Sequence, residues 1–503
     1  MSARAAAAGE AFAASAGLFG EITGWLDGDE AARLTHAELE VELGSRGREL
    51  TRRLYQDHLD LRAMREQRRE QVAGGDGVTR TRAETGHDRP LTTVFGQVQV
   101  SRIAYRAPGA PNLHPADAAL NLPGEKHSHG IRKIAAVESA RGSFQDASAA
   151  ITRAAGVRVG KRQVEELSMR AATDVDAFYA ARRPGPAADE VLLALQFDGK
   201  GIVMRPEALR EATAKAAAAA SPKLATRLSP GEKHGRKRMA ELAAVHDVVP
   251  VPRVPADIIR PPGDSSAQPP RNPGPRAAGK WLTASVTDDI PAVIAAGFDE
   301  AGRRDPGPRR AWVALVDGNN AQIEAISAEA GRRGVTVPIL IDFIHVLEYI
   351  WKAAWSFFDK GDPAAEEWVA ANATKILDGK AGQVATGIRR RATLFGYSPA
   401  ERAGADECAA YLTAKASFLD YPTALARGWP IATGVIEGAC RHLVKDRMDI
   451  TGARWGLAGA EAILKLRALI SNGDLDEYWP FHLRQEHQRV HQAHYQEDVT
   501  LAA

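Results

Sequence analysis

The sequence predicts a multidomain protein in which a layered α/β domain is combined with all-α regions. The chain has 503 residues, several times the length of an average domain. In its middle third, short continuous apolar runs alternate with helical patterns, the pattern of a layered α/β domain. Such runs are typical of strands that are buried on both faces of a sheet.

The composition excludes several classes of protein. Apolar residues make up 45% and charged residues 25% of the chain, which are ordinary globular values and argue against a disordered or fibrous protein. A net charge of +2 means that binding to nucleic acid would depend on local basic patches. Two cysteines, Cys408 and Cys440, cannot form a disulfide framework or a four-cysteine zinc site, and they favour a reducing compartment.

No segment has the composition of a membrane span. The most apolar segment, residues 337–358, contains four titratable side chains that would be costly in lipid, namely Asp342, His345, Glu348 and Lys352. The alanine-rich N-terminus lacks the pattern of a signal peptide, because Glu10 interrupts it and Arg4 is its only basic lead-in. We expect a soluble, cytoplasmic protein with access to DNA and no membrane partner.

The N-terminal part is predicted to be mainly helical. From Thr35 to Glu70, leucines recur at spacings of four and seven, which predicts a helix whose apolar stripe faces either the core or a dimer seam. These leucines are Leu39, Leu43, Leu50, Leu54 and Leu61. Residues 92–106 contain β-branched and aromatic side chains on both sides of Gly96, which indicates two short strands or a hairpin.

A helix-turn-helix pattern follows at residues 143–172. Gly156 separates two helical segments, and Lys161 and Arg162 begin the second. A second helix of this kind can lie in the major groove of DNA. Two helices joined by a glycine turn are also common in proteins that do not bind DNA, so the segment alone leaves both readings open.

Three apolar runs in the middle of the chain predict strands, at residues 191–197, 312–316 and 335–341. Helical patterns at 290–301 and 321–333 lie between them. Before the first of these helices, residues 207–220 form an alanine-rich helical pattern, and residues 250–275 hold nine prolines, which predicts a poorly ordered surface loop.

The strongest basic patch lies between these two stretches. We interpret it as a flexible segment that either contacts DNA phosphates or is simply solvated. Its basic residues are Lys223, Arg227, Lys233, Arg236, Lys237 and Arg238.

The last part of the chain is predicted to be helical. Residues 346–426 contain five aromatic side chains near their start, which are expected to pack a separate small core: Tyr349, Trp351, Trp355, Phe357 and Phe358. Residues 433–471 are predicted to be helical with breaks at Gly452, Gly456 and Gly459.

Each of the three apolar runs ends in an aspartate: Asp198, Asp317 and Asp342. Ligands of open α/β sheets bind at the carboxyl ends of the strands, so these acids are expected to converge. Carboxylates that lie close together repel one another and are stable mainly beside a hard cation such as Mg²⁺. A single strand-end aspartate is weak evidence, because Asp-Gly, present at Asp198 and Asp317, is also common turn chemistry that ends a strand without any site.

Glu437 supplies a further acid. It lies on a predicted helix with Thr433 as a possible N-cap, and Arg441 and Lys445 follow one and two turns later. These residues form either an exposed salt-bridge pair or a metal-binding carboxylate beside two cations that contact phosphate.

Five segments of the chain resemble a known family. FDGKGIVMRPEAL, ALVDGNNAQI, DFIHVLEYIWKAAW, GVIEGACRHLVKDRM and TGARWGLAGAEAILKLRAL are similar, in this order, to the ISKra-type transposases of prokaryotic insertion sequences. These enzymes belong to the Mutator-like group of DDE transposases. The resemblance extends from about Thr93 to Trp479.

The resemblance implies an RNase H-like mixed sheet flanked by helices, with Asp198 on the first strand, Asp317 after the fourth and Glu437 on a late helix. These acids would bind two Mg²⁺ ions, with Mn²⁺ able to substitute. The implied activity is cleavage of double-stranded DNA at the terminal inverted repeats of a bacterial mobile element, followed by transfer of the 3'-hydroxyl to target DNA. Bringing two ends together implies at least a dimer on DNA, in the cytoplasm near the nucleoid.

The resemblance also assigns secondary residues. Asp342 and His345 match an Asp-x-x-His motif with a structural or DNA-handling role, although a histidine in an aromatic helix is equally well a core residue. Arg454 and Trp455 match an Arg-Trp motif, and Trp455 either stacks on an unpaired base or packs the C-terminal helix. The N-terminal region would recognise the ends of the element.

The expected organisation has five parts. They are an N-terminal helical region (1–90), a hairpin and helix-turn-helix-like region (91–185), an RNase H-like core (186–346) with a basic, proline-rich insertion (207–275), an all-α insertion (347–430), and a catalytic helix with a tail (431–503). Two other functions remain open: an RNase H-like nuclease that cuts without joining, and a non-catalytic DNA-binding regulator derived from a transposase.

Overall fold

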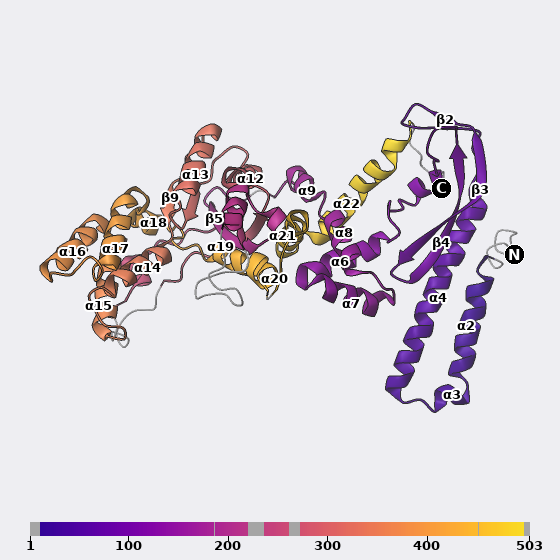
Figure 1. The fold of residues 1–503 in the computed structure, drawn as a ribbon, viewed down its shortest axis with the longest axis horizontal. Coiled ribbons are helices and arrows are strands. Elements are labelled where there is room, and N and C mark those ends of the chain that lie inside the picture. The colour runs from indigo at the N-terminus through magenta and orange to yellow at the C-terminus, as the bar shows by residue number, and fades with distance from the viewer. Residues whose placement is uncertain (1–10, 186, 220–235, 261–271, 451, 497–503) are drawn as a thin grey trace. The chain divides into compact units, whose positions relative to one another are not determined.

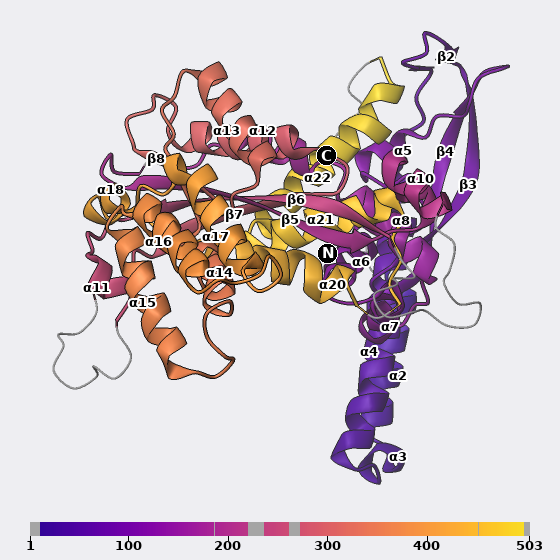
Figure 2. The same cartoon turned by 60° about the vertical axis from the view of Figure 1, so that its left-hand side comes forward.

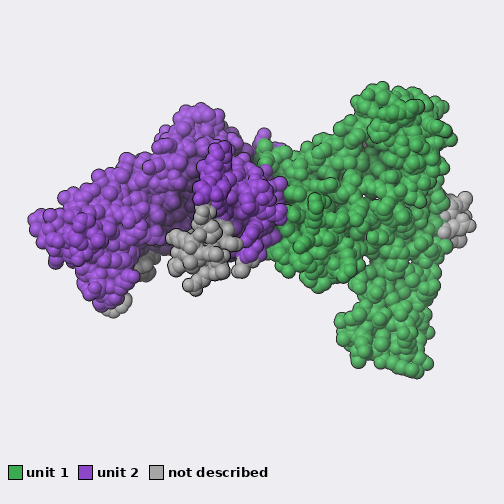
Figure 3. Space-filling view, viewed as in Figure 1, with its two compact units in different colours: residues 1–180, 473–503 green, residues 181–472 purple. Residues whose placement is uncertain are grey.

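The computed structural model describes residues 11–185, 187–219, 236–260, 272–450 and 452–496. It contains two compact units, formed by residues 1–180 with 473–503 and by residues 181–472 (Figure 3). The end of the chain therefore belongs to the first unit, and the expected single C-terminal part over 431–503 is wrong. A buried ion pair is one of the contacts that hold the chain end there: Arg132 of α6 (His129–Arg141) lies 2.8 Å from Glu486 of α22 (Leu475–Val490).

The first unit begins with two long helices, α2 (Ala13–Leu26) and α4 (His36–Arg65), joined through the short α3 (Asp29–Ala32) (Figure 1). Thr35 and Glu38 form a capping box that fixes the start of α4. The leucine stripe of α4 is only partly covered, with Leu39, Leu50 and Leu61 half-buried. Leu43 and Leu54 are exposed, and the buried residues of α4 are Asp57 and Leu59; the dimer seam stays a prediction.

A hairpin follows α4. Strands β3 (Arg82–Thr93) and β4 (Gly96–Arg106) pair antiparallel, which confirms the predicted hairpin and extends its first strand. A second antiparallel pair, β1 (Val72–Ala73) and β2 (Thr79–Arg80), precedes it. The region 1–90 is thus not purely helical. Leu59 of α4 shares a buried cluster with side chains of the hairpin.

The predicted helix pair is present as α7 (Phe144–Ala155) and α8 (Lys161–Ala171). Gly156 ends α7 with a φ of 68°, a left-handed conformation that glycine adopts without strain. Together with α6, the pair encloses a small apolar core. The other helices in the described residues of this part are α5 (Pro115–Ala119), α9 (Val175–Ala181) and the 3-10 helix η4 (Gln492–His494).

The second unit is built on a five-stranded mixed sheet flanked by helices (Figure 2). Its strands lie in the order β7-β6-β5-β8-β9. The central β5 pairs parallel with β8, which pairs parallel with β9, whereas β6 is antiparallel to both β5 and β7. The strands are β5 (Leu192–Val203), β6 (Lys237–Val248), β7 (Ala277–Ser285), β8 (Trp312–Val316) and β9 (Ile339–Ile341).

The three predicted strands are confirmed, but two further strands were missed. Strand β6 lies inside the region 207–275 that was expected to be an insertion, and β7 follows it. Both strands carry runs of alanine, a residue with weak strand propensity, and they form because they pair with β5 and with each other. The expected basic, proline-rich insertion is therefore wrong over β6. Of the proline-rich stretch, residues 261–271 lie outside the described residues.

Helices cover both faces of the sheet. Helix α12 (Ile290–Arg304) lies against one face, where a Cβ on Gly297 would come within 2.8 Å of the ring of Phe197. On the other face, Gln196 bonds to α19 (Gly434–Ala439), and α21 (Leu457–Ser471) packs near β7. Helix α13 (Asn320–Arg333) connects β8 to β9. Gly459 lies inside α21, so the break predicted there is wrong.

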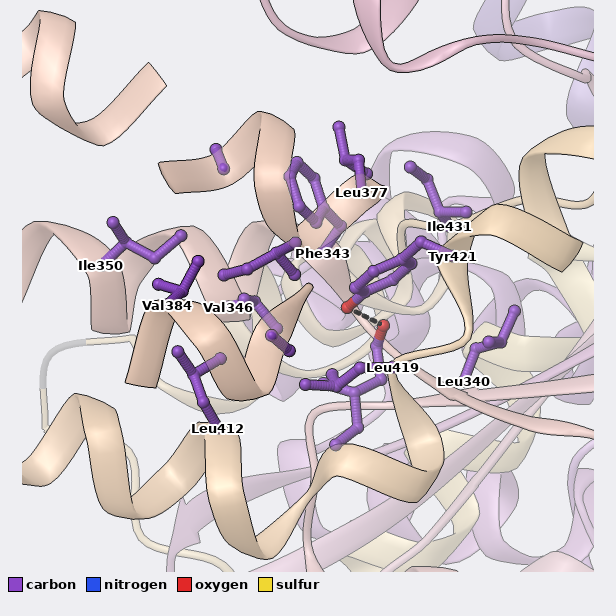
Figure 4. Packing of buried hydrophobic residues seen from close by; sticks show 14 of the residues in the cluster. Leu340, Phe343, Val346, Ile350, Leu377, Val384, Leu412, Leu419, Tyr421 and Ile431 are labelled. Carbon is purple, nitrogen blue, oxygen red and sulfur yellow. Dashed lines mark hydrogen bonds between the residues drawn. The ribbon is translucent and has the colours of Figure 1, made fainter. Parts of the chain in front are cut away.

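The predicted all-α region shares its core with the sheet, so the expected separate small core is wrong. Buried residues of β5, β8 and β9 and of the helices form one cluster, part of which Figure 4 shows. Tyr421 is fully buried in it and donates a hydrogen bond to the carbonyl of Ile341 (2.9 Å). The helices are α14 (Phe343–Ala354), α15 (Pro363–Leu377), α16 (Ala381–Leu394), α17 (Ala403–Ala414) and α18 (Tyr421–Ala426).

Short elements complete the second unit: the 3-10 helices η1 (Pro206–Ala208) and η2 (Ala416–Phe418), α10 (Glu211–Ala219), α11 (Pro255–Ile258), the π-helix η3 (Cys440–Lys445) and α20 (Asp446–Met448). Across the described residues, no helix is both long and apolar enough to pass through a membrane.

Tyr421→Phe should lower the free energy of unfolding by about 1–3 kcal/mol, because the buried carbonyl of Ile341 loses its donor. Chemical denaturation followed by tyrosine and tryptophan fluorescence measures the change. Tyr397→Phe in the same helical region, at a half-buried side chain, is the matched control. Equal stability of Tyr421→Phe and wild type would contradict the hydrogen bond between Tyr421 and the carbonyl of Ile341.

Candidate active site

Acidic side chains from four separate segments line one pocket in the second unit. Its volume is about 170 Å³, and its lining includes Asp198, Asp317, Asp342, His345 and Glu437. The expected convergence of these acids is therefore present in the structure. The pocket lies beside the central strand β5, and the chain reaches it from β5, β8, β9 and α19.

Asp198 lies within β5 rather than at its end. The strand continues to Val203 and pairs with β6 throughout, with Asp198 opposite Leu242. The carboxylate accepts hydrogen bonds from the backbone N–H of Gly199 (2.6 Å) and from the thiol of Cys440 (3.1 Å). The expectation that Asp198 terminates a strand is wrong, because the β6 partner carries β5 past the apolar run.

Asp317 directly follows β8, as predicted. Its carboxylate accepts a hydrogen bond from the N–H of Asn319 (2.9 Å), and its carbonyl accepts one from the hydroxyl of Tyr411 (3.1 Å). Gly318 has a φ of 99°, and a Cβ at this position would come within 2.6 Å of that hydroxyl. The turn that orients Asp317 therefore requires glycine.

Glu437 reaches the pocket because α19 is held against β5. Gln196, two residues before Asp198 and buried, accepts a hydrogen bond from the N–H of Ile436 (3.0 Å) and donates one to the carbonyl of Ala432 (3.4 Å). The α-helix then changes into the π-helix η3 at Cys440. Thr433 occupies the N-cap position of α19 but makes no side-chain capping bond.

The hydroxyl of Thr433 donates instead to the carboxylate of Asp342. Asp342 is buried, and its carboxylate also accepts a hydrogen bond from the N–H of Ile344 (2.9 Å), which caps α14. His345 is half-buried, lies 3.3 Å from Glu348 and contacts the rings of Tyr349 and Tyr411. Asp342 thus fixes local structure in addition to lining the pocket.

Three acids of the pocket, Asp198, Asp342 and Glu437, have raised pKa values. Burial, together with the neighbouring Asp317, raises the pKa of Asp198. Burial and the charges of Asp342 and Asp198 raise the pKa of Glu437, and burial raises that of Asp342. Carboxylate oxygens in such an environment are suited to a hard divalent cation. In this conformation, however, the described residues contain no group of three or more His, Cys, Asp or Glu side chains placed to hold a metal ion.

Sequence reasoning missed three residues around the acids: Cys440, Gln196 and Glu241. Glu241 lies on β6 opposite Gly199 and is buried. Burial raises its pKa, and the charges of Asp198 and Asp317 raise it further, while Arg210 lowers it. A single acid within the apolar run of β6 was the signal that could have identified Glu241.

In the part of the chain that the structure describes, the cations predicted near Glu437 do not form a simple salt-bridge pair with it. Arg441 is exposed and lies 3.9 Å from Asp446, and Lys445 is also exposed. Both residues lie in the π-helix η3, so they do not follow Glu437 at α-helical spacing. Arg467 of α21 donates to the carbonyl of Leu443 (2.9 Å) and so supports this segment.

Three residues of the basic patch, Arg236, Lys237 and Arg238, are described by the structure. Lys237 and Arg238 lie in β6, so the expectation that they belong to a flexible segment is wrong. Lys237 lies 3.5 Å from Asp449, and Arg238 donates to the carbonyl of Val286 (2.7 Å). Arg236 is exposed. Lys223, Arg227 and Lys233 lie outside the described residues.

The two residues of the Arg-Trp motif differ in exposure. Arg454 is exposed, whereas Trp455 is buried, donates to the carbonyl of Met448 (3.0 Å) and has the guanidinium of Arg447 over its ring at 4.7 Å. Its backbone also bonds to Val203 at the end of β5. Trp455 thus has the packing role in this structure. In the first unit, Lys161 and Arg162 are exposed at the start of α8.

None of the protein-family models compared with the chain matches it, and no curated protein is significantly similar to it.

Asp198→Asn should raise the midpoint of thermal unfolding at pH 7 by a few degrees. The raised pKa means that the folded state holds the Asp198 proton more tightly than the unfolded state, so this stabilisation is lost as the pH rises through the folded pKa. Asparagine removes the buried charge but keeps an acceptor for Gly199. Thermal melts across pH measure the effect.

The difference between Asp198→Asn and wild type should shrink below about pH 4, where the aspartate is protonated in both states. Asp359→Asn, at an exposed position after α14, is the control and should have little effect at any pH. A lower unfolding midpoint for Asp198→Asn at pH 7 would contradict the proposed burial of charge.

Proposed function

We propose that this protein is a DNA transposase that cleaves double-stranded DNA at the terminal inverted repeats of an insertion sequence and joins the 3'-hydroxyl end to target DNA. One observation carries the proposal. Asp198, Asp317 and Glu437, which are far apart in the sequence, line the same pocket. A set of converging carboxylates is what two-metal phosphoryl transfer requires.

The placement of the acids supports an RNase H-like core. Asp198 lies on the first strand of the sheet, Asp317 follows the fourth, and Glu437 lies on a late helix. A mixed sheet flanked by helices, with a helical region between Asp317 and Glu437, is the arrangement that the resemblance to ISKra-type transposases implies. The proposal includes Mg²⁺ as cofactor, with Mn²⁺ able to substitute.

The residues of the chain have separable roles. Asp198, Asp317 and Glu437 would hold the ions, which when bound activate the attacking oxygen and stabilise the leaving oxygen of an in-line displacement. Gly199 and Cys440 orient the carboxylate of Asp198, and Asn319 orients that of Asp317. Gln196 holds α19, so that Glu437 faces the same pocket.

Recognition of DNA is assigned to cations outside the pocket. Helices α7 and α8 would act as a helix-turn-helix that reads the terminal repeats, with Lys161 and Arg162 on phosphates. In the second unit the exposed Arg441, Lys445, Arg454 and Arg236 would contact the backbone near the cleaved bond. Joining two ends implies at least a dimer on DNA. A protein that acts on bacterial DNA would be located beside the nucleoid.

Incubation of the purified protein with labelled terminal duplexes and Mg²⁺ should give strand-specific cuts and joined products, and EDTA should abolish both. Asp198→Ala, Asp317→Ala and Glu437→Ala should each reduce cleavage to background, because each removes a carboxylate from the pocket. Denaturing gels resolve cut and joined strands.

Asp359→Ala, at an exposed acid outside the pocket, should leave both steps unchanged. Full strand transfer by Asp198→Ala would rule out the proposed mechanism. Cleavage without joined products would favour the alternative of an RNase H-like nuclease.

A non-catalytic DNA-binding regulator is the second candidate, and one observation favours it. Among the described residues, the acids of the pocket do not form a group of three or more side chains that could hold a metal ion in this conformation. Nicking of DNA that depends on Mg²⁺ would exclude this candidate.

Lys161→Ala and Arg162→Ala should each weaken binding to a terminal duplex and lower the slope of log K against log salt by about 0.9, because each phosphate contact releases about one counterion. Fluorescence anisotropy between low and moderate salt measures the slope. Lys215→Ala, at an exposed lysine of α10, is the control. Unchanged slopes for both variants would argue against α8 as the DNA-binding helix.

A further inference from the structure

One side of α14, together with its C-cap residue Trp355, carries a stripe that the proposed chemistry does not use. Ile344, Glu348, Trp351 and Trp355 recur at spacings of four, three and four, which places them on one side of the helix. Ile344, Glu348 and Trp355 are exposed and Trp351 is half-buried. Ile344 is 47% and Trp355 41% exposed. The stripe runs about 16 Å along the helix, at 1.5 Å per residue.

The opposite face of α14 is fixed in the core. Phe343, Val346 and Ile350 are buried in the cluster shared by the helices and the sheet (Figure 4). The helix therefore cannot rotate to bury the exposed stripe without losing this packing. The exposure of Ile344 and Trp355 follows from how α14 is docked.

The stripe begins in the acidic pocket. Ile344 and Glu348 line the pocket together with Asp198, Asp317 and Glu437. At about 170 Å³, the pocket has room for part of one nucleotide strand and not for a base-paired duplex. When a phosphate of a DNA strand enters the pocket, the neighbouring nucleotides of that strand lie beside α14.

The stripe ends in a stacked pair of aromatic rings. The rings of Trp351 and Trp355 lie 5.2 Å apart with an interplanar angle of 27°. Trp351 packs against the buried cluster, so it supports Trp355 from the inner side. An exposed tryptophan supported in this way offers an aromatic face on which any base can stack.

We propose that Trp355 is a stacking platform for an unpaired base of the DNA strand held in the acidic pocket. The inference rests on the proposed function, since it names how that site handles its DNA. Glu348 adds negative charge to the stripe, which disfavours a phosphate contact and leaves stacking as the attractive interaction. Trp355 thereby takes the stacking role that the sequence had suggested for Trp455, which is buried.

The test uses a terminal duplex with a short single-stranded flap that carries 2-aminopurine, whose fluorescence falls when it stacks. The protein carries Asp198→Ala, so that the DNA is not consumed. Trp355→Ala added to this background should weaken flap binding about tenfold, as loss of one stacked base does, and should remove the quenching. Trp355→Phe should retain most of both signals.

Phe395→Ala is the matched control. Phe395 is an exposed aromatic residue at the end of α16, 62% accessible and outside the stripe, and its loss should change neither affinity nor quenching. The effect of Trp355→Ala should persist as salt is raised, because stacking does not depend on counterion release. Thermal melts check that each variant is folded.

Three outcomes separate the inference from the proposed function. Equal affinity and equal quenching in Trp355→Ala would overturn the inference, even if the wild-type protein cleaves DNA. Loss of quenching in Trp355→Ala, with no cleavage by wild type, would support the platform and refute the transposase. A shift in oligomeric state of DNA-free Trp355→Ala, without change in flap binding, would show that a second copy covers Trp355 and would also overturn the inference.

Discussion

The side chain of Gln196 connects the two segments on which the candidate site depends. It lies on the central strand, and its amide bonds to both sides of the start of α19, at Ala432 and Ile436. The helix that carries Glu437 is thereby held two residues along the strand from Asp198, although 239 positions separate the two acids in the sequence. A buried amide can fix this contact because both its donor and its acceptor are satisfied by backbone groups.

The carboxylates that meet in the pocket disfavour one another's charged forms. Burial removes water and raises the pKa values of Asp198, Asp342 and Glu437, and repulsion from neighbouring carboxylates raises those of Asp198 and Glu437 further. Hydrogen bonds from backbone N–H groups and from Thr433 and Cys440 offset part of this cost. Acids whose pKa values are raised by burial and by one another make this pocket a candidate functional site.

The all-α region and the sheet form a single structural body around the pocket. Their shared core fixes one face of α14 and directs the other face, with Trp355, to solvent. Gly404 of α17 lies so close to α14 that a Cβ there would come within 2.4 Å of the carbonyl of Lys352. The helical region therefore shares one core with the sheet, and its helix α14 lines part of the pocket.

The sequence by itself determined the features that depend on neighbours in the chain. Apolar runs predicted three of the five strands, helical periodicity and Gly156 predicted the pair α7 and α8, and the aspartates after those runs predicted an acidic site. Only the tertiary structure decided what depends on distant segments: the inclusion of β6 in the sheet, the burial of Trp455, the exposure of Trp355 and the return of the chain end to the first unit. The periodicity of a sequence indicates which residues can be buried. Which of them are buried depends on strand pairing and packing between segments that are distant in the sequence.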